Sequence, residues 1–217
     1  HNIGFMALDR IAADHGFGPW RKAFQGLVSE GRLGAEKVVL LKPETFMNLS
    51  GQSVQAALAF YKLPLADVTV FHDELDLAPG KCRVKSGGGH AGHNGLRSIH
   101  QHLGEAYGRV RLGIGHPGHK DAVAGYVLHD FARADQDWLD DLLRGLSEGA
   151  PALADGDATR FMNAVSLRTA PPRSGGAAAA APPPAAKPAP PPAPSLPAPA
   201  AEAEERSAMD RLMDRFR

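Results

Sequence analysis

Hydrophobic and polar positions along the chain follow two periods, one typical of helices and the other of strands. Near the start, Phe5, Leu8, Ile11 and Ala12 recur at helical spacing. Short runs rich in leucine and β-branched residues predict strands at 37–41, 68–71, 81–84 and 109–114. Further helices are predicted at 50–61, 96–103, 135–146 and 159–167. This alternation predicts an α/β fold, a single-domain three-layer sandwich with a mixed, mostly parallel twisted sheet flanked by helices.

The start of the chain is unusual for such a fold. It opens with His1 and Asn2 rather than with a methionine, and no strand pattern precedes the first predicted helix. A sheet protein that begins on a helix either starts on an atypical element or has lost a strand. The pattern therefore predicts that the first strand is missing and that the N-terminus is truncated.

The composition changes sharply after residue 170. Residues 171–200 are almost entirely proline and alanine, which cannot build a core and favour extended conformers. Within 201–217, Met209, Leu212, Met213 and Phe216 recur at helical spacing. The predicted organisation is a catalytic domain at 1–169, a disordered linker at 170–200 and a short amphipathic helix at 201–217. That helix could dock on an unknown partner, and a solvated tail is the alternative.

The overall composition limits the class of protein. With 217 residues, of which 43% are hydrophobic, the chain can bury one substantial core. Its single cysteine, Cys82, cannot form an internal disulfide, and no run is apolar enough for a signal segment or a membrane span. These features predict a cytoplasmic monomer without membrane contact.

Charge is unevenly distributed although the formal net charge is zero. Between residues 81 and 111 the only acid is Glu105, whereas 130–157 is dominated by acids. The basic residues of the first segment are Lys81, Arg83, Lys85, Arg97, Arg109 and Arg111. A local basic surface of this kind suits a ligand that carries phosphate groups.

Polar groups gather at predicted strand ends and in a glycine-rich segment. Residues 87–95 contain five glycines together with His90, His93 and Asn94, so a ligand can approach the main chain closely. Asn48 and Asp73 each lie at or just after a predicted strand, where open α/β sheets bind ligands. The sequence predicts that these groups assemble into one site.

The residue types of this site are compatible with several chemistries. His90 and His93 with Asp73 or Asp76 could form a zinc set, although a glycine-rich loop does not force the rings to converge. Neither nucleotide-binding glycine motif is present, and no nucleophile elbow occurs. General-base hydrolysis remains, in which a histidine held by a carboxylate takes a proton from water. The zinc hydrolase stays open as an alternative.

Four motifs in order carry a specific resemblance. They are FMNLSG at 46–51, HDELDL at 72–77, GGGHAGHNG at 87–95 and RLGIGHP at 111–117. Together they resemble the bacterial-type peptidyl-tRNA hydrolases, and the opening HNIG is similar to the His-Asn-x-Gly segment of that family. The resemblance runs from residue 1 to about residue 169.

The resemblance implies a reaction and a catalytic pair. The reaction is hydrolysis of the ester between peptide and tRNA in peptidyl-tRNA released from ribosomes, which recycles the tRNA without a metal or an organic cofactor. By carry-over, His1 is the general base, and Asp73 orients it and stabilises the imidazolium that forms.

The resemblance also implies binding residues. Substrate-binding roles fall on Met47, Asn48, His93 and Asn94, with the two amides bonding the peptide carbonyl, the ester or the attacking water. Lys85 and Arg111 correspond to a basic clamp for a tRNA phosphate. Two of these residues also have a structural alternative, which is helix capping for Asn48 and a turn for Asn94.

The sequence departs from the family at its beginning. Family members start with a strand that ends in a Gly-Asn-Pro-Gly turn, and the asparagine of that turn positions substrate. Nothing before His1 corresponds to it. We therefore predict activity in a protein with the upstream residues restored and not in this chain. A catalytically impaired tRNA- or RNA-binding module is the alternative function.

Overall fold

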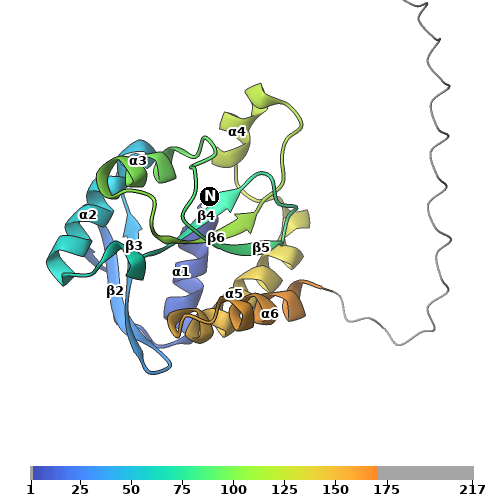
Figure 1. Cartoon of the computed structure of the whole chain (residues 1–217). Coiled ribbons are helices and arrows are strands. Elements are labelled where there is room, and N and C mark those ends of the chain that lie inside the picture. Colours follow the sequence, from blue (N-terminus) through green and yellow to red (C-terminus); the bar gives the residue numbers. More distant parts are fainter. Residues whose placement is uncertain (1, 171–217) are drawn as a thin grey trace, which may run out of the picture. The chain divides into compact units, whose positions relative to one another are not determined.

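The structure is a computed structural model that describes residues 2–170 of the chain. The predicted helix at 201–217 and the linker from 171 onward lie outside these residues. The described part contains six α-helices and six strands (Figure 1). The helices are α1 (Ile3–Asp14), α2 (Ser50–Tyr61), α3 (Asn94–Leu103), α4 (Val123–Leu128), α5 (Gln136–Ala154) and α6 (Ala158–Thr169). The strands are β1 (Arg21–Ala23), β2 (Gly26–Leu33), β3 (Glu36–Pro43), β4 (Thr69–Glu74), β5 (Cys82–Ser86) and β6 (Gly108–Gly113).

The strands form two separate three-stranded sheets. In the first, β1, β2 and β3 are antiparallel, and Val28 pairs with Leu41. In the second, the order is β4-β6-β5, with β4 parallel to β6 and β5 antiparallel to β6. The α/β class is confirmed, but the prediction of one mostly parallel sheet is wrong for these residues, because only β4 and β6 run parallel.

The two sheets are separated by a large cavity. β3 and β4 are edge strands of their sheets, and segments 36–41 and 68–73 both line a hollow of about 1080 Å³. No strand precedes α1 within residues 2–170. The free edges of β3 and β4 therefore border a space that no described strand occupies.

Helices cover both faces of the second sheet. The main core lies between this sheet and α1, α5 and α6, and its fully buried members include Val110, Leu112, Leu142 and Phe161. On the other face, Leu96 of α3 packs near the start of β4. Because side chains alternate along a strand, Arg109 and Arg111 point away from the core that holds Val110 and Leu112.

The helix limits match the periodic pattern closely. The structure confirms the helix at 50–61 to the residue, and α3 ends at Gly104 with a left-handed φ of 88°, which favours glycine. Capping of α2 by Asn48 or Ser50 is wrong, since its N-cap is Leu49 without a side-chain bond. Within 2–170, no helix has the length and apolar character that a membrane crossing requires.

Candidate functional site

Asp73 and His93 form the polar centre of the site. Asp73 lies near the end of β4, and His93 is the N-cap of α3, so the sheet and the helix start are joined by their side chains. Nε2 of His93 is 3.1 Å from Oδ1 of Asp73. Nδ1 of His93 accepts hydrogen bonds from the N–H groups of Gly95 and Leu96, at 3.1 and 3.2 Å.

This network assigns the protonation of the His93 ring. Because Nδ1 accepts two hydrogen bonds, it carries the lone pair, and Nε2 therefore carries the hydrogen that is donated to Asp73. Both ring nitrogens are occupied. His93 can hold Asp73 in place, but in this arrangement it has no free nitrogen with which to accept a proton from water.

The electrostatics keep Asp73 ionised. Burial alone would raise the pKa of Asp73, but the hydrogen bond from His93 and its other interactions outweigh burial and hold the pKa below its ordinary value. Within the described part of the chain, no other residue donates a hydrogen bond to Oδ2 of Asp73. A fixed carboxylate with one free oxygen can orient an imidazole and stabilise its charged form.

His72, the neighbour of Asp73, is buried and neutral at pH 7. Its side chain is only 5% exposed, and its Nδ1 donates to the carbonyl oxygen of Asp73 at 2.8 Å. Burial, together with the nearby His93, lowers the pKa of His72 to about 4. The remaining nitrogen, Nε2, is buried and has no partner among residues 2–170. Sequence reasoning gave His72 no role, since burial of one imidazole in a strand leaves no distinct signal.

We expect His72 to make the fold sensitive to mild acid. Between pH 6.5 and 4 the unfolded chain binds a proton on His72 that the folded chain does not bind, so stability falls as the pH drops through this range. The loss should be about 3 kcal/mol in the free energy of unfolding. Urea unfolding at pH 7, 5.5 and 4 would measure it.

The His72→Gln variant provides the comparison for this pH dependence. It should show a flatter dependence between pH 6.5 and 4, and an equally steep fall in that variant would contradict the assignment. The lowered pKa values of Asp73 and Glu74 add to the loss at the acid end, because the stability that they contribute begins to fall near their ordinary pKa values of 3.8 and 4.5. The parent and His72→Gln proteins share this contribution, so their difference reports His72.

The predicted base, His1, lies outside the described residues. Its sequence neighbour Asn2 caps α1, with Oδ1 accepting from the N–H of Phe5 at 3.1 Å. Asn2 also lines the large cavity between the sheets, which Asp73 and His93 line as well. The capping role of Asn2 was readable from an asparagine directly before an apolar helical pattern.

The predicted substrate-binding residues fall on two neighbouring segments. Met47 and Asn48 lie in the short 3-10 helix η1 (Met47–Leu49), which contacts α3. Met47 lines the cavity and packs against the start of α3, since a Cβ added to Gly95 would be 2.7 Å from its Sδ. Asn48 and Asn94 are exposed, and Oδ1 of Asn94 accepts a hydrogen bond from Arg97. The structure thus brings Met47 to Asp73 and His93, whereas neither asparagine lines the cavity.

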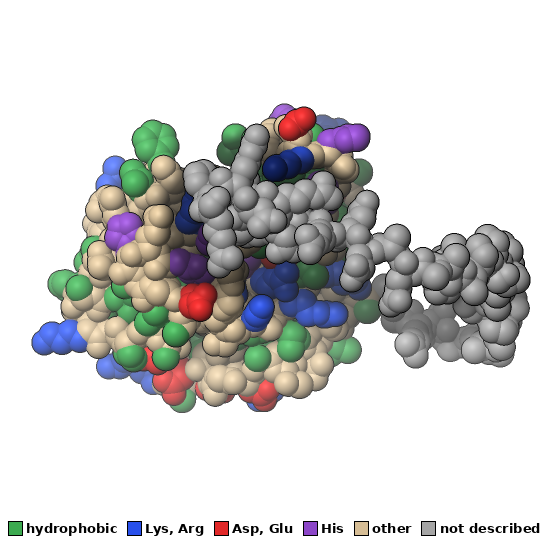
Figure 2. Space-filling view, turned by 45° about the horizontal axis from the view of Figure 1, so that its top comes forward, with side chains coloured by type: hydrophobic (Ala, Val, Ile, Leu, Met, Phe, Trp, Pro, Cys, Tyr) green, Lys and Arg blue, Asp and Glu red, His purple; other side chains and the backbone are tan. Residues whose placement is uncertain are grey.

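The basic residues of β5 and β6 lie on one face of the second sheet. Lys85 on β5 is directly opposite Arg109 on β6, and Arg83 is opposite Arg111. Nε of Arg111 is 2.8 Å from Oε2 of the buried Glu74, so its charge is already paired. Figure 2 shows Lys and Arg side chains near the middle of one face of the molecule, beside histidines. Lys85 and Arg111, the predicted clamp, are diagonal neighbours rather than opposite partners.

The residues of the alternative zinc site do not converge. Among residues 2–170, no group of three or more His, Cys, Asp or Glu side chains is arranged to hold a metal ion. His90 instead packs edge-on against His100 with ring centroids 5.7 Å apart, and both nitrogens of His93 are engaged.

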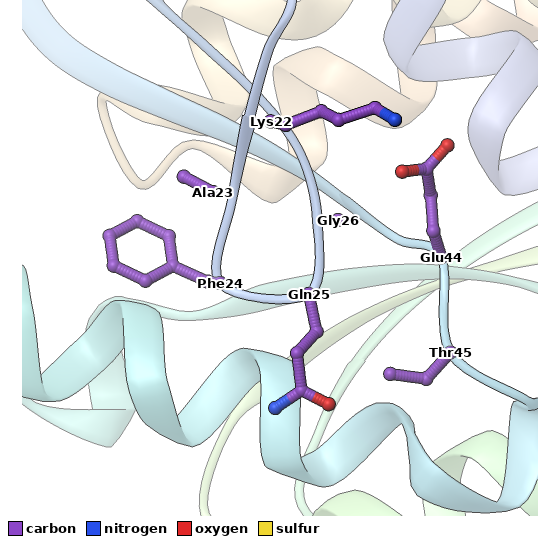
Figure 3. A pocket seen from close by; sticks show the side chains of 7 residues that line it. All are labelled: Lys22, Ala23, Phe24, Gln25, Gly26, Glu44 and Thr45. Carbon is purple, nitrogen blue, oxygen red and sulfur yellow. The ribbon is translucent and has the colours of Figure 1, made fainter.

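A second, smaller hollow lies at the turn between β1 and β2 (Figure 3). Its walls come from residues 22–26 and 44–45, which include none of the predicted site residues. Phe24 and Gln25 in this turn both have positive φ values, 51° and 56°. The turn is fixed by Oγ of Ser53, which donates to the carbonyl oxygen of Phe24 at 2.5 Å. Glu44 and Thr45 also line the large cavity, so this hollow borders the cavity that Asp73 lines.

Comparison with known proteins places the chain in a family. The family model described as peptidyl-tRNA hydrolase matches residues 1–173. A peptidyl-tRNA hydrolase of Ruegeria pomeroyi is 69% identical over all of this chain and 92% of its own length, and one of Cereibacter sphaeroides is 72% identical with the same coverage. A solved peptidyl-tRNA hydrolase from Acinetobacter baumannii has 38% identity and a TM-score of 0.71, covering 76% of this chain and 85% of that one. These matches give no support to the predicted truncation. The chain belongs to the peptidyl-tRNA hydrolase family.

Proposed function

We propose that the protein hydrolyses the ester bond between peptide and tRNA in peptidyl-tRNA, with His1 as general base and Asp73 as its orienting carboxylate. The family membership supports the reaction. The observation that carries the mechanism is the state of Asp73, which is ionised and fixed through Oδ1 by His93, with Oδ2 unbonded by the other described residues. Asn2, next to His1 in the sequence, lines the same cavity.

The proposed steps conserve atoms and charge. The imidazole of His1 takes a proton from water, and the resulting hydroxide attacks the ester carbonyl of the peptide. Asp73 stabilises the imidazolium formed in this step. When the tetrahedral intermediate collapses, the C–O bond to the ribose breaks, and the imidazolium returns its proton to the leaving oxygen. The products are tRNA and the carboxylic acid of the free peptide, which loses its proton to water at neutral pH.

The other two histidines of the site do not fit the role of base. Both nitrogens of His93 are engaged, and His72 is buried with a pKa of about 4. A base with such a low pKa removes a proton from water poorly at neutral pH. These two observations support His1 as the base.

Binding of the substrate involves the remaining predicted residues. Asn48 and Asn94 supply uncharged amides that bond the peptide main chain, and Met47 forms an apolar wall. Lys85 and Arg111 provide positive charge for a tRNA phosphate. The proposed partner is peptidyl-tRNA, with no resident metal, and the proposed setting is a monomer in the cytoplasm. Residues 1–169 act as the catalytic domain.

The parent protein and its His1→Ala variant test the mechanism. The assay is release of N-acetylated amino acid from tRNA. We expect turnover by the parent protein and a loss of about 10²–10⁴-fold on His1→Ala. Equal turnover by a folded His1→Ala protein would refute the base assignment.

A second function, tRNA binding without catalysis, would use only the basic residues that β5 and β6 place on one face of the second sheet. Binding of uncharged tRNA together with no release of the peptide would distinguish it from the hydrolase.

A further inference from the structure

The hollow at the turn between β1 and β2 borders the cavity of the proposed catalytic site. Its volume is about 520 Å³, within the range of pockets that bind small ligands. Glu44 and Thr45 line both spaces. Met47, which lines the catalytic cavity, follows Thr45 by two residues, so their Cα atoms are at most about 7 Å apart. The hollow therefore begins a short distance from the wall of the site.

Three polar side chains around this hollow have no partner within the protein. Lys22, Gln25 and Glu44 are exposed, and none of them forms a side-chain hydrogen bond or an ion pair with a residue of the described range 2–170. Figure 3 shows the side chains of Lys22 and Glu44 pointing into the same region, with Gln25 extending from the tip of the turn. An ammonium group, a carboxylate and a carboxamide together can bond both the donors and the acceptors of a ligand.

Gln25 has a backbone conformation that is unfavourable for its residue type. The turn between β1 and β2 consists of Phe24 and Gln25, and both have positive φ. Asparagine and glycine are preferred in such turns, because they adopt positive φ with little strain. Packing explains Phe24, whose ring contacts the rings of Phe60 and Tyr61. The side chain of Gln25 instead lines the hollow, and strain of this kind clusters at ligand-binding sites.

Hydrogen bonds to the main chain hold this turn in place. The N–H of Glu44 donates to the carbonyl oxygen of Gln25 at 2.9 Å, and Oγ of Ser53 donates to that of Phe24. The turn is thereby tied to the end of β3 and to α2. A group presented from a fixed backbone loses less conformational entropy when it binds a ligand.

We infer that the hollow binds the peptide part of peptidyl-tRNA, at residues upstream of the one that carries the ester. The inference rests on the proposed function and extends it, since the catalytic cavity holds the ester and the hollow holds preceding residues. An extended peptide advances about 3.3 Å per residue, so roughly the second to the fourth residue from the ester reaches the hollow. The amide of Gln25 bonds the peptide main chain whatever its sequence, and Lys22 and Glu44 attract side chains of opposite charge.

The KM values of two substrates test this inference. N-acetyl-aminoacyl-tRNA is too short to reach the hollow, whereas N-acetyl-tetrapeptidyl-tRNA reaches it. In Gln25→Gly we expect the KM for the long substrate to rise about fivefold with kcat unchanged, and the KM for the short one to stay within about twofold. Glu44→Gln should raise the KM about threefold for a tetrapeptide that contains lysine and not for one that contains glutamate.

Lys62→Gly is the matched control. Lys62 ends α2 with a φ of 55°, and it lines neither the hollow nor the cavity. Glycine relieves the same backbone conformation at both positions. Gln25→Gly and Lys62→Gly should therefore unfold at the same urea concentration as the parent or at a higher one, but only Gln25→Gly should change the ratio of the two KM values. A purely structural role of Gln25 would not change this ratio in a folded protein.

An unchanged ratio of KM values in folded Gln25→Gly and Glu44→Gln proteins would overturn the inference. A KM that rose equally for the short and the long substrate would also overturn it, because the hollow would then contact the tRNA rather than the peptide. Failure of the proposed function has a different result, in which the parent protein releases neither the amino acid nor the tetrapeptide from tRNA.

Discussion

Replacing Asp73 with asparagine is expected to slow peptidyl-tRNA hydrolysis by about 10²–10⁴-fold. Asparagine keeps an oxygen that can accept the hydrogen bond from Nε2 of His93, so the local geometry is retained. What it loses is the negative charge that stabilises an imidazolium during proton transfer. Single-turnover release of N-acetylated amino acid from tRNA, at saturating enzyme, measures this step.

The control for this variant is a measurement of its free energy of unfolding. Asp73→Asn should unfold within about 1 kcal/mol of the parent protein at pH 7, because a neutral hydrogen bond replaces a charge-assisted one. His93→Gln is the companion variant, since it removes the support of Asp73 and leaves the charge in place. If Asp73→Asn retained full turnover while folded, the carboxylate would have no part in the chemistry.

Replacing Gly51 with alanine is expected to lower the free energy of unfolding by about 3 kcal/mol and to reduce turnover as well. Gly51 lies where α2 crosses α3, and its N–H donates to Oγ of Ser98 at 2.9 Å. A Cβ at this position would clash with the carbonyl oxygen of Ser98 and lie 2.6 Å from Nδ1 of His102. The helices would have to separate, which displaces Asn94 relative to Asn48.

The loss of turnover follows from that displacement. A shift of about 1 Å in positioning groups can cost about 100-fold in rate. Urea unfolding and saturating-substrate turnover give the two quantities. Gly125→Ala in α4 is the matched control, because its nearest neighbour would be 4.0 Å away and the change should stabilise the helix by about 0.5–1 kcal/mol. A Gly51→Ala protein as stable and active as the parent would show that the close approach is not required.

The periodic pattern predicted the elements that pack on the main core. The helix at 50–61 and the strand at 109–114 were readable because burial of one face imposes a regular spacing. The hairpin of β2 and β1 was missed, since Gly26, Gly31 and several charges interrupt the alternation in β2. Its stability comes from pairing with β3, a non-local contact that no short window of sequence contains.

The candidate site was predicted in part. The motifs identified Asp73, Met47 and His93 as neighbours, and they line one cavity. The sequence does not predict that His93 supports Asp73, because this role depends on the N–H groups of Gly95 and Leu96, which donate to one nitrogen of the His93 ring. The pairing of Lys85 with Arg109 likewise follows from the strand register, which charge patterns along the chain do not encode.

Among residues 2–170, the outer edges of β3 and β4 have no strand partner, which affects how the protein behaves at high concentration. A row of free N–H and C=O groups is a template for any extended chain, including one from another molecule. The gap between these edges is lined by Val38, Leu40 and Val70, so an apolar segment that entered it would be buried. Strand exchange between molecules, and aggregation during synthesis, would therefore begin at this gap rather than at the polar outer surface.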